Sequence, residues 1–210
     1  MAKPGLMNMG EARALEERYT YGDYKSWDDD LRWELIDGEA YCLSSRSGGM
    51  SPGPGAAHQI LQAKLFNYFD GKECQVLVHP FDVMLPEGDE PEDEIDSVVQ
   101  PDIMVVCDKS KIQHNGIKGA PDVVFEILSP STAQRDLDEK FHLYERAGVK
   151  EYVIADPHNR VIHAYRIDAE GRFSFRKVYV ADDVLEFGMF PELKIPLSAV
   201  WGDIRDLAVN

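Results

Sequence analysis

The chain has 210 residues, of which 44% are hydrophobic and 29% are charged, and its formal net charge is −16. This composition fits one globular domain with a hydrophobic core and excludes an intrinsically disordered chain. The negative charge excludes a general polyanion-binding protein, because nucleic-acid affinity comes largely from Lys and Arg contacts to phosphates. A nucleic-acid role would therefore need a metal ion and a local basic strip.

Membrane and secretion signals are not expected. No apolar run approaches the roughly 20 residues that a spanning helix needs, and the N-terminus lacks the apolar region of a signal peptide. The three cysteines, Cys42, Cys74 and Cys107, are far apart and form no CxxC pattern. The sequence therefore predicts free, mostly buried thiols in a reducing, cytoplasmic compartment.

The N-terminal residues 1–19 are expected to form a tail and a short helix over 11–18, followed by a single domain over 20–210. A capping-box pattern at 20–23 predicts a second short helix that ends near Trp27.

A β-hairpin is predicted next, because two half-apolar runs over 32–36 and 39–44 flank the tight-turn pair Asp37-Gly38. The Ser/Gly/Pro-rich segment 44–55 is expected to be a flexible loop. A helix follows, with apolar residues at helical spacing at positions 60, 61, 65, 66 and 69.

Strands are predicted over 75–79 and 81–85, followed by an acidic, solvated loop over 86–97. The segments 98–106 and 121–129 are apolar and rich in β-branched residues, as the central strands of a covered sheet are.

The segment 131–147 has a helical pattern and stops at Gly148. A strand over 151–156, a hairpin over 160–180 and an irregular tail complete the chain. This order predicts an α/β fold, a mixed sheet with helices packed on it.

Glu126 is unusual because its neighbours on the same face of the strand are the apolar Val124 and Leu128. A buried, ionised carboxylate costs several kcal/mol unless it is paired or binds a metal. Asp102, at the start of the apolar run IMVV, poses the same problem. If the two strands pair, both carboxylates can point to one place.

Two carboxylates and a backbone carbonyl form a hard oxygen site suited to Mg²⁺ or Mn²⁺. Asp122 lies four residues before Glu126 on one strand, roughly 13 Å away, so these two cannot share an ion directly. A structural alternative stays open, in which Asp102 is a turn residue and Glu126 pairs with a buried cation such as Lys140.

Lys140 borders the inward face of its predicted helix, whose apolar stripe is Leu137, Phe141 and Tyr144. A lysine there could hold a metal-bound water or stabilise charge on a phosphoryl oxygen. The alternative is a lysine that packs its stem on apolar surface and exposes its amine.

His58 and Glu34 are weaker candidates. His58 opens a helix after the flexible loop, and Glu34 lies within a predicted strand, so each could instead have only a structural role. The sequence contains no GxSxG, P-loop, GxGxxG or HExxH pattern, which disfavours nucleophilic and nucleotide-fold interpretations.

One family is resembled by an ordered combination of motifs, the Uma-two type of bacterial restriction endonucleases. The combination is WELIDGE, His58, QPDIMVV, PDVVFEILSPST, then Asp136, Lys140 and Tyr144, and finally GVKEYVIADP. This family is a branch of the PD-(D/E)XK nuclease superfamily. The resemblance runs from about Thr20 to Pro157. It implies a restriction-endonuclease-like core, in which a central mixed β-sheet is flanked by helices.

The resemblance also implies roles for individual residues. Asp102 and Glu126 match the acidic residues of the superfamily motif, and Ile127 would contribute its backbone carbonyl to the metal. Leu128 stands where the motif has a lysine, and Lys140 resembles the relocated lysine of other branches. His58 and Glu34 match recurrent family positions, as candidate members of the same site.

The resulting hypothesis is a metal-dependent phosphodiesterase that acts on DNA. Asp102 and Glu126 would bind Mg²⁺ or Mn²⁺, and Lys140 would orient the attacking water or stabilise the developing charge. Specificity would come from loops such as 44–55 and the locally basic 108–119. Endonucleases of this type often pair subunits, so a homodimer is compatible with the resemblance. Two rivals are a catalytically inactive interaction module on the nuclease fold and a metal-dependent hydrolase of a smaller substrate.

Overall fold

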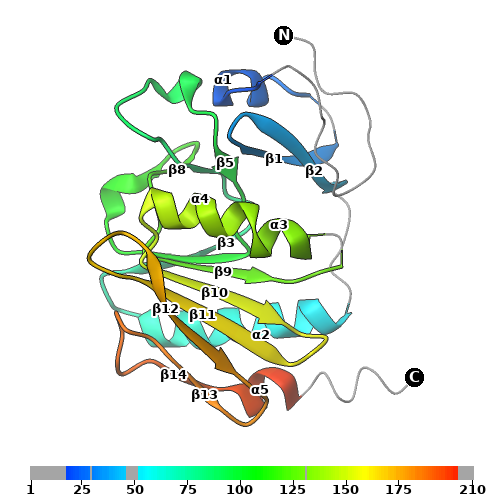
Figure 1. Cartoon of the computed structure of the whole chain (residues 1–210), viewed down its shortest axis with the longest axis vertical. Helices are drawn as coiled ribbons and strands as arrows, with labels where there is room; N and C mark the ends of the chain where they lie inside the picture. The colour runs from blue at the N-terminus through cyan, green and yellow to red at the C-terminus, as the bar shows by residue number, and fades with distance from the viewer. Residues whose placement is uncertain (1–17, 29, 46–51, 131, 203–210) are drawn as a thin grey trace.

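The computed structural model describes residues 18–28, 30–45, 52–130 and 132–202. This part of the chain forms two six-stranded mixed sheets with helices between and beyond them (Figure 1). The second sheet is the mixed sheet flanked by helices that the sequence predicts, so the α/β class is confirmed. The first sheet adds a further layer above it.

The first sheet has the strand order β2-β1-β5-β4-β8-β7. Its β1–β2 hairpin turns at Asp37 and Gly38, whose φ angles of 53° and 76° are those of the predicted tight turn. The strands are β1 (Leu31–Ile36), β2 (Glu39–Ser45), β4 (Val83–Met84), β5 (Val98–Val99), β7 (Ile112–Gln113) and β8 (Gly116–Lys118).

The second sheet has the order β12-β11-β10-β9-β6-β3, in which β9 and β10 are parallel and the other neighbours are antiparallel. A small separate hairpin joins β13 (Val184–Glu186) and β14 (Lys194–Pro196). The strands of the second sheet are β3 (Gln75–Val78), β6 (Ile103–Val106), β9 (Val123–Ile127), β10 (Glu151–Asp156), β11 (Val161–Ile167) and β12 (Phe173–Tyr179).

The helices cover both faces of the second sheet (Figure 1). The pair α3 and α4 lies between the two sheets, whereas α2 and α5 lie on the opposite face. The helices are α1 (Tyr21–Tyr24), α2 (Pro52–Phe69), α3 (Ala133–Leu137), α4 (Glu139–Ala147) and α5 (Leu197–Gly202), with 3₁₀ turns η1 (Glu92–Glu94) and η2 (Lys109–Lys111). Among the residues described, no helix is long and apolar enough to cross a membrane.

Apolar side chains fill the spaces between these layers. Leu61, Leu65 and Phe69 of α2 pack on one face of the second sheet. Leu143 and Tyr144 of α4 pack on its other face, in a cluster that also includes residues of the first sheet. The helix α4 is therefore enclosed on two sides, and a polar side chain on its inward face, such as Lys140, has little access to water.

The predicted strand 98–106 is divided in two. β5 pairs with the first sheet, and β6 pairs with the second. Pro101 lies at the crossing and has no backbone N–H, so it cannot continue a central ladder. Asp102 therefore stands where the chain passes from one sheet to the other.

The predicted helix 131–147 is also divided. Asp138, with φ −124° and ψ −76°, separates α3 from α4, and Gly148 ends α4 in the left-handed conformation, as predicted. Helical periodicity does not extend across such a break, so Leu137 is 47% exposed instead of lying on the predicted apolar stripe. Lys140 is buried on the inward face.

The ends of several elements differ from their predicted positions. The helix α1 opens with the predicted capping box but stops at Tyr24. The predicted loop 44–55 is helical from Pro52, and its residues 46–51 lie outside the described part, as does nearly all of the predicted helix 11–18. The irregular tail contains β13, β14 and α5.

The prediction of three free thiols is wrong for two of them. Cys74 and Cys107 form a disulfide, and Cys42 is free and buried. The register of β3 and β6 explains the pair, because Gln75 lies opposite Val106. The residue before the first strand and the residue after the second therefore face each other, which spacing along the chain does not reveal.

Candidate functional site

A group of charged side chains is buried between the two sheets. Each is at most 4% exposed, although charged residues are rarely buried unless they are paired. The acids come from three elements and the bases from two helices. The members are Glu34 on β1, Glu126 on β9, Arg135 and Asp136 on α3, and Lys140 on α4.

Lys140 lies at the centre of this group. Its Nζ is 2.8 Å from Oε1 of Glu34, 2.9 Å from Oε1 of Glu126 and 3.6 Å from Oδ1 of Asp136. Burial alone would lower the pKa of Lys140, but the charges of Glu126, Glu34 and Asp136 together raise it. The neighbouring carboxylates therefore favour the charged form of Lys140, and the alternative of an exposed amine is wrong, because Lys140 is 3% exposed.

Glu126 is held by two donors. Its Oε1 accepts hydrogen bonds from Lys140 at 2.9 Å and from the Tyr144 hydroxyl at 2.7 Å. Burial raises the pKa of Glu126 well above its usual value, against the opposing effect of Lys140. The carboxylates of Asp136 and Asp102 raise it further. Both donors bind the same oxygen, and among the described residues no hydrogen bond joins a donor to the second oxygen of Glu126.

Asp102 lies beside Glu126, as predicted from strand pairing. In the antiparallel ladder Ile103 lies opposite Phe125, and one further step of this register places Asp102 opposite Glu126. Oδ2 of Asp102 accepts a 2.7 Å hydrogen bond from the backbone N–H of Ile127. Burial raises the pKa of Asp102 to about 7, although that hydrogen bond and Lys140 both oppose the shift.

Glu34 joins the group from the first sheet. Its Oε1 accepts from Lys140 and from the backbone N–H of Gln100, the latter at 2.8 Å, and its Oε2 lies 3.5 Å from Arg135. Burial would raise the pKa of Glu34, but Lys140 and Arg135 hold it below its usual value. Glu34 is thus the carboxylate of the group that most strongly favours its ionised form.

The group carries more acid than base. Four carboxylates surround two cations, counting Asp102 with Glu34, Glu126 and Asp136 against Lys140 and Arg135. When all are ionised, the described residues leave two negative charges uncompensated. The raised pKa values of Asp102, Glu126 and Asp136 follow first from burial and then from the neighbouring carboxylates. Either protons or a divalent cation would neutralise it.

The donor chemistry fits a hard cation. Asp102 and Glu126 present oxygen atoms only, which Mg²⁺ and Mn²⁺ prefer, and Mg²⁺ is usually bound by one or two carboxylates together with waters and substrate phosphates. Within the described ranges, no group of three or more His, Cys, Asp or Glu residues is arranged to hold a metal by itself. An ion here would therefore depend on ligands beyond the side chains, such as the predicted Ile127 carbonyl.

His58 touches the site through the main chain. It is 7% exposed on α2, and its Nε2 donates to the backbone carbonyl of Asp102 over 3.2 Å. Its ring lies 5.3 Å from that of His79 in an edge-to-face contact. Burial lowers the pKa of His58, which keeps the imidazole neutral. The geometry therefore assigns it a contact with the Asp102 backbone, not with the carboxylate.

Asp122 lies outside the charged group and has other partners, as its distance from Glu126 along the strand predicts. Its carboxylate accepts from the backbone N–H of Cys107 at 2.7 Å and from Lys150 at 2.6 Å. Leu128, at the motif's lysine position, packs against the apolar cluster under α4. The ammonium group beside Glu126 comes from Lys140 on α4, at 2.9 Å.

Two members of the group, Arg135 and Asp136, were not among the predicted site residues. Asp136 lies one helical turn before Lys140, with Oδ1 at 3.6 Å from Nζ, and this i,i+4 spacing was a usable signal. Arg135 pairs with Glu34 and stacks 4.8 Å from the Tyr41 ring. Its partners lie about a hundred residues away, so no local pattern could identify it.

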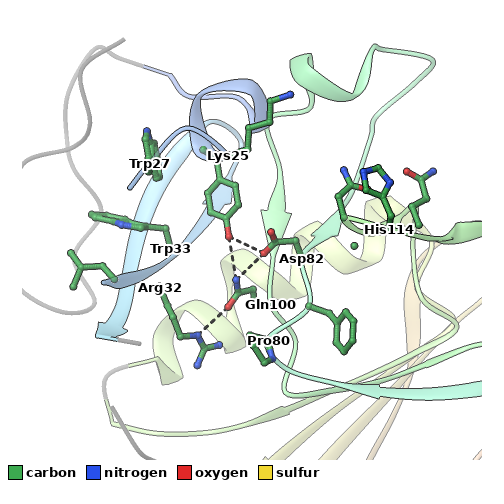
Figure 2. A pocket seen from close by; sticks show the side chains of 14 residues that line it. Lys25, Trp27, Arg32, Trp33, Pro80, Asp82, Gln100 and His114 are labelled. Carbon is green, nitrogen blue, oxygen red and sulfur yellow. Dashed lines mark hydrogen bonds between the residues drawn. The ribbon is translucent and has the colours of Figure 1, made fainter. Parts of the chain in front are cut away.

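A cleft of about 660 Å³ adjoins the charged group. Figure 2 shows Trp27, Trp33 and Arg32 on one side, His114 on the other, and Asp82 and Gln100 between them. Gln100 connects the two regions, because its backbone N–H binds Glu34 while its side chain lies in the cleft. The predicted specificity loop 108–119 contributes the tip that carries His114.

Similarity to known proteins agrees with the fold. Residues 21–198 match the Uma2 family, described as "Putative restriction endonuclease". The uncharacterized protein slr1290 of Synechocystis sp. is 25% identical over 167 residues, 78% of this chain and 82% of its own length. A crystal structure from Anabaena variabilis, titled a putative nuclease belonging to DUF820, superposes with a TM-score of 0.67. It is 18% identical and covers 87% of this chain and 97% of its own.

Proposed function

The chain belongs to the Uma2 family of restriction-endonuclease-like proteins, and from that premise we propose that it is a metal-dependent endonuclease that hydrolyses phosphodiester bonds in DNA. The observation that carries this proposal is the β6–β9 register, which sets Asp102 opposite Glu126 inside a group with excess negative charge. Two adjacent carboxylates that resist ionisation are poised to accept a divalent cation.

Asp102 and Glu126 would hold Mg²⁺ or Mn²⁺. When bound, such an ion polarises a scissile phosphate and lowers the pKa of an attacking water. The chain itself prepares the ligands. The Ile127 amide orients Asp102, and Lys140 together with Tyr144 orients Glu126, so that one oxygen of each acid is fixed by a hydrogen bond.

Lys140 holds the group together in this proposal. Its ammonium bridges Glu126 on β9 and Glu34 on β1, and it would stabilise the charge that develops on a phosphoryl oxygen nearby. It reaches the site from α4, which supports the interpretation that it replaces the lysine missing at Leu128. His58 supports the turn that carries Asp102 by binding its carbonyl.

The experiment is cleavage of plasmid and single-stranded DNA in the presence of Mg²⁺, Mn²⁺ or EDTA. Asp102→Asn and Glu126→Gln keep the shape of each side chain and remove its charge. We expect divalent-dependent cleavage that falls about 100-fold or more in both variants, since each removes a metal ligand. Glu94→Gln, an exposed acid on η1, is the matched control and should cleave normally.

Circular dichroism and thermal melting would establish that each variant is folded. Cleavage that persists equally in Asp102→Asn and Glu126→Gln would come from a contaminant and would refute the proposal. Because the chain carries a charge of −16 and has few cations to neutralise phosphates, it should release few counterions on binding DNA, and cleavage should depend only weakly on salt concentration.

A second candidate function is a catalytically inactive interaction module on the same fold. Leu128 at the lysine position and the existing Lys140–Glu126 ion pair favour it, because the pair already stabilises Glu126 without a metal. It predicts no Mg²⁺ or Mn²⁺ binding by calorimetry and no cleavage. Replacement of Lys140 does not separate the two functions, since this buried ion pair is structural in both.

A further inference from the structure

The cleft of about 660 Å³ has the walls of a site for a flat aromatic ligand. Trp27 lies 5.5 Å from Trp33 and 5.7 Å from Tyr24 between ring centroids, in edge-to-face contacts. Phe81, another lining residue, is 41% exposed. The volume lies in the range of small-molecule sites, and an exposed phenyl ring at a cleft provides apolar surface for a planar partner.

The floor of the cleft is polar and ordered. Oδ1 of Asp82 accepts hydrogen bonds from the Tyr24 hydroxyl and from Nε2 of Gln100, both at 2.8 Å. Oε1 of Gln100 accepts from Nε of Arg32 at 3.0 Å (Figure 2). This network holds the Asp82 carboxylate and the Arg32 guanidinium on the two sides of the Gln100 amide in an aromatic cleft.

This combination matches the chemistry of a nucleobase. A base has two π faces that stack on aromatic rings and an edge that carries both hydrogen-bond donors and acceptors. An exocyclic amino group would suit Asp82, and a ring nitrogen or carbonyl would suit Arg32. The charged floor disfavours a purely apolar ligand, since Asp82 and Arg32 would lose solvation without compensation.

Gln100 places the cleft next to the proposed active site. Its backbone N–H donates to Glu34, which is bonded to Lys140, while its side chain organises the cleft floor. We propose that the cleft binds one unpaired base of the nucleic-acid substrate and thereby positions the neighbouring phosphate at the carboxylates. This inference rests on the proposed nuclease function and defines its substrate as single-stranded or base-flipped DNA.

A base can enter this cleft only when its pairing edge is free. In a duplex that edge is occupied and the faces are stacked, so entry requires extrusion of the nucleotide, at a cost of a few kcal/mol. We therefore expect tighter binding of a single strand than of the same sequence as a duplex. A protein that held only phosphates would show the opposite preference, because duplex DNA has the higher charge density.

The test measures binding without cleavage. A fluorescein-labelled single-stranded dodecamer, its duplex and a dodecamer of abasic spacers are titrated by fluorescence anisotropy in EDTA. Phe81→Ala should weaken single-strand binding about tenfold, as expected for loss of one stacking ring. Phe66→Ala is the matched control, because Phe66 is 43% exposed on α2, on the opposite face of the second sheet.

The abasic strand separates base binding from phosphate binding. Phe81→Ala should bind the abasic strand with the same affinity as the wild type. Arg32→Gln tests the polar floor of the cleft, and it should weaken binding of the normal strand more than binding of the abasic strand. The inference is overturned if Phe81→Ala binds the normal strand like the wild type, if Phe66→Ala loses as much affinity, or if the wild type binds no single strand.

Failure of this inference can be told from failure of the proposed function. Metal-dependent cleavage that needs Glu126, with Phe81→Ala binding and cleaving normally, would refute the cleft alone. Single-strand binding that needs Phe81, with no cleavage in Mg²⁺ or Mn²⁺, would support the cleft and refute hydrolysis. Glu94→Gln, at an exposed acid on η1, should retain single-strand affinity in EDTA and serves as the charge-matched control.

Discussion

The ammonium group of Lys140 lies 2.8 Å from the carboxylate of Glu34 and so joins the helix α4 to the first sheet. Glu34 is fully buried and Lys140 is 3% exposed. An ion pair in such surroundings is costly to form and more costly to break, because removing one partner leaves the other charge buried and uncompensated. This relationship makes the charged group a structural element as well as a candidate active site.

Lys140→Met should destabilise the fold by about 3–5 kcal/mol, since Glu34 and Glu126 would lose their shared cation. Urea denaturation of the two proteins measures the difference. Lys194→Met removes an exposed partner of Glu186 and should cost less than about 1 kcal/mol. The double variant Lys140→Met with Glu34→Gln should regain part of the lost free energy of unfolding, because it no longer buries the unpaired Glu34 charge. A purely additive double variant would contradict the coupling described here.

Asp102→Asn should be more stable than the wild type at pH 8 in EDTA. The pKa of Asp102 is raised from its usual value to about 7, so the folded state holds more protons than the unfolded state between about pH 4 and 7. Stability therefore decreases as the pH rises through this window. Asparagine resembles the protonated acid, and its advantage should reach about 1–3 kcal/mol at pH 8 and vanish near pH 4.

Manganese provides the control for this pH effect. If Asp102 binds a divalent ion, then Mn²⁺ at pH 8 should raise the melting temperature of the wild type and leave that of Asp102→Asn unchanged. Equal shifts in the two proteins would mean that the ion binds elsewhere.

Reduction of the Cys74–Cys107 disulfide should lower stability by about 2–4 kcal/mol, because it releases a constraint across 33 residues of the unfolded chain. Thiol titration in denaturant should find only Cys42 before reduction and all three cysteines afterwards. Three reactive thiols in protein that was never reduced would contradict the pairing. Urea denaturation with and without dithiothreitol measures the contribution of the disulfide to the free energy of unfolding.

Gly116→Ala should disturb the cleft. A Cβ at this position would lie 2.4 Å from the backbone oxygen of Asp82, and the φ of Gly116 is +145°. The substitution should cost about 1–3 kcal/mol and weaken single-strand binding, since alanine is strained at this φ and the clash would displace Asp82, which lines the cleft. Gly71 also has a positive φ, of +71°, but a Cβ there meets nothing within 4 Å, so Gly71→Ala should leave binding unchanged. Parallel melting and anisotropy measurements compare the two variants.

Several features of the protein follow from the sequence because they depend on neighbouring residues. The Asp37-Gly38 turn and the end of α4 at Gly148 need only local backbone conformations. The strand that carries Glu126 can also be predicted from its apolar, β-branched residues. Its carboxylate stands out because burying a charge among such residues is costly unless the charge is paired. Pairing of the two predicted strands extended this observation to the convergence of Asp102 with Glu126, and the resemblance to a known family implied a metal between them.

Other features depend on contacts between distant segments, and only the tertiary structure decided them. The break of the predicted strand 98–106 sends β5 and β6 to different sheets, and the partners of Lys140 lie on β1 and β9. The disulfide and the cleft depend on register and on side chains from several elements. Sequence alone showed that Asp102 and Glu126 needed a compensating charge, whereas the packing of α4 between two sheets determined that Lys140 would supply part of it.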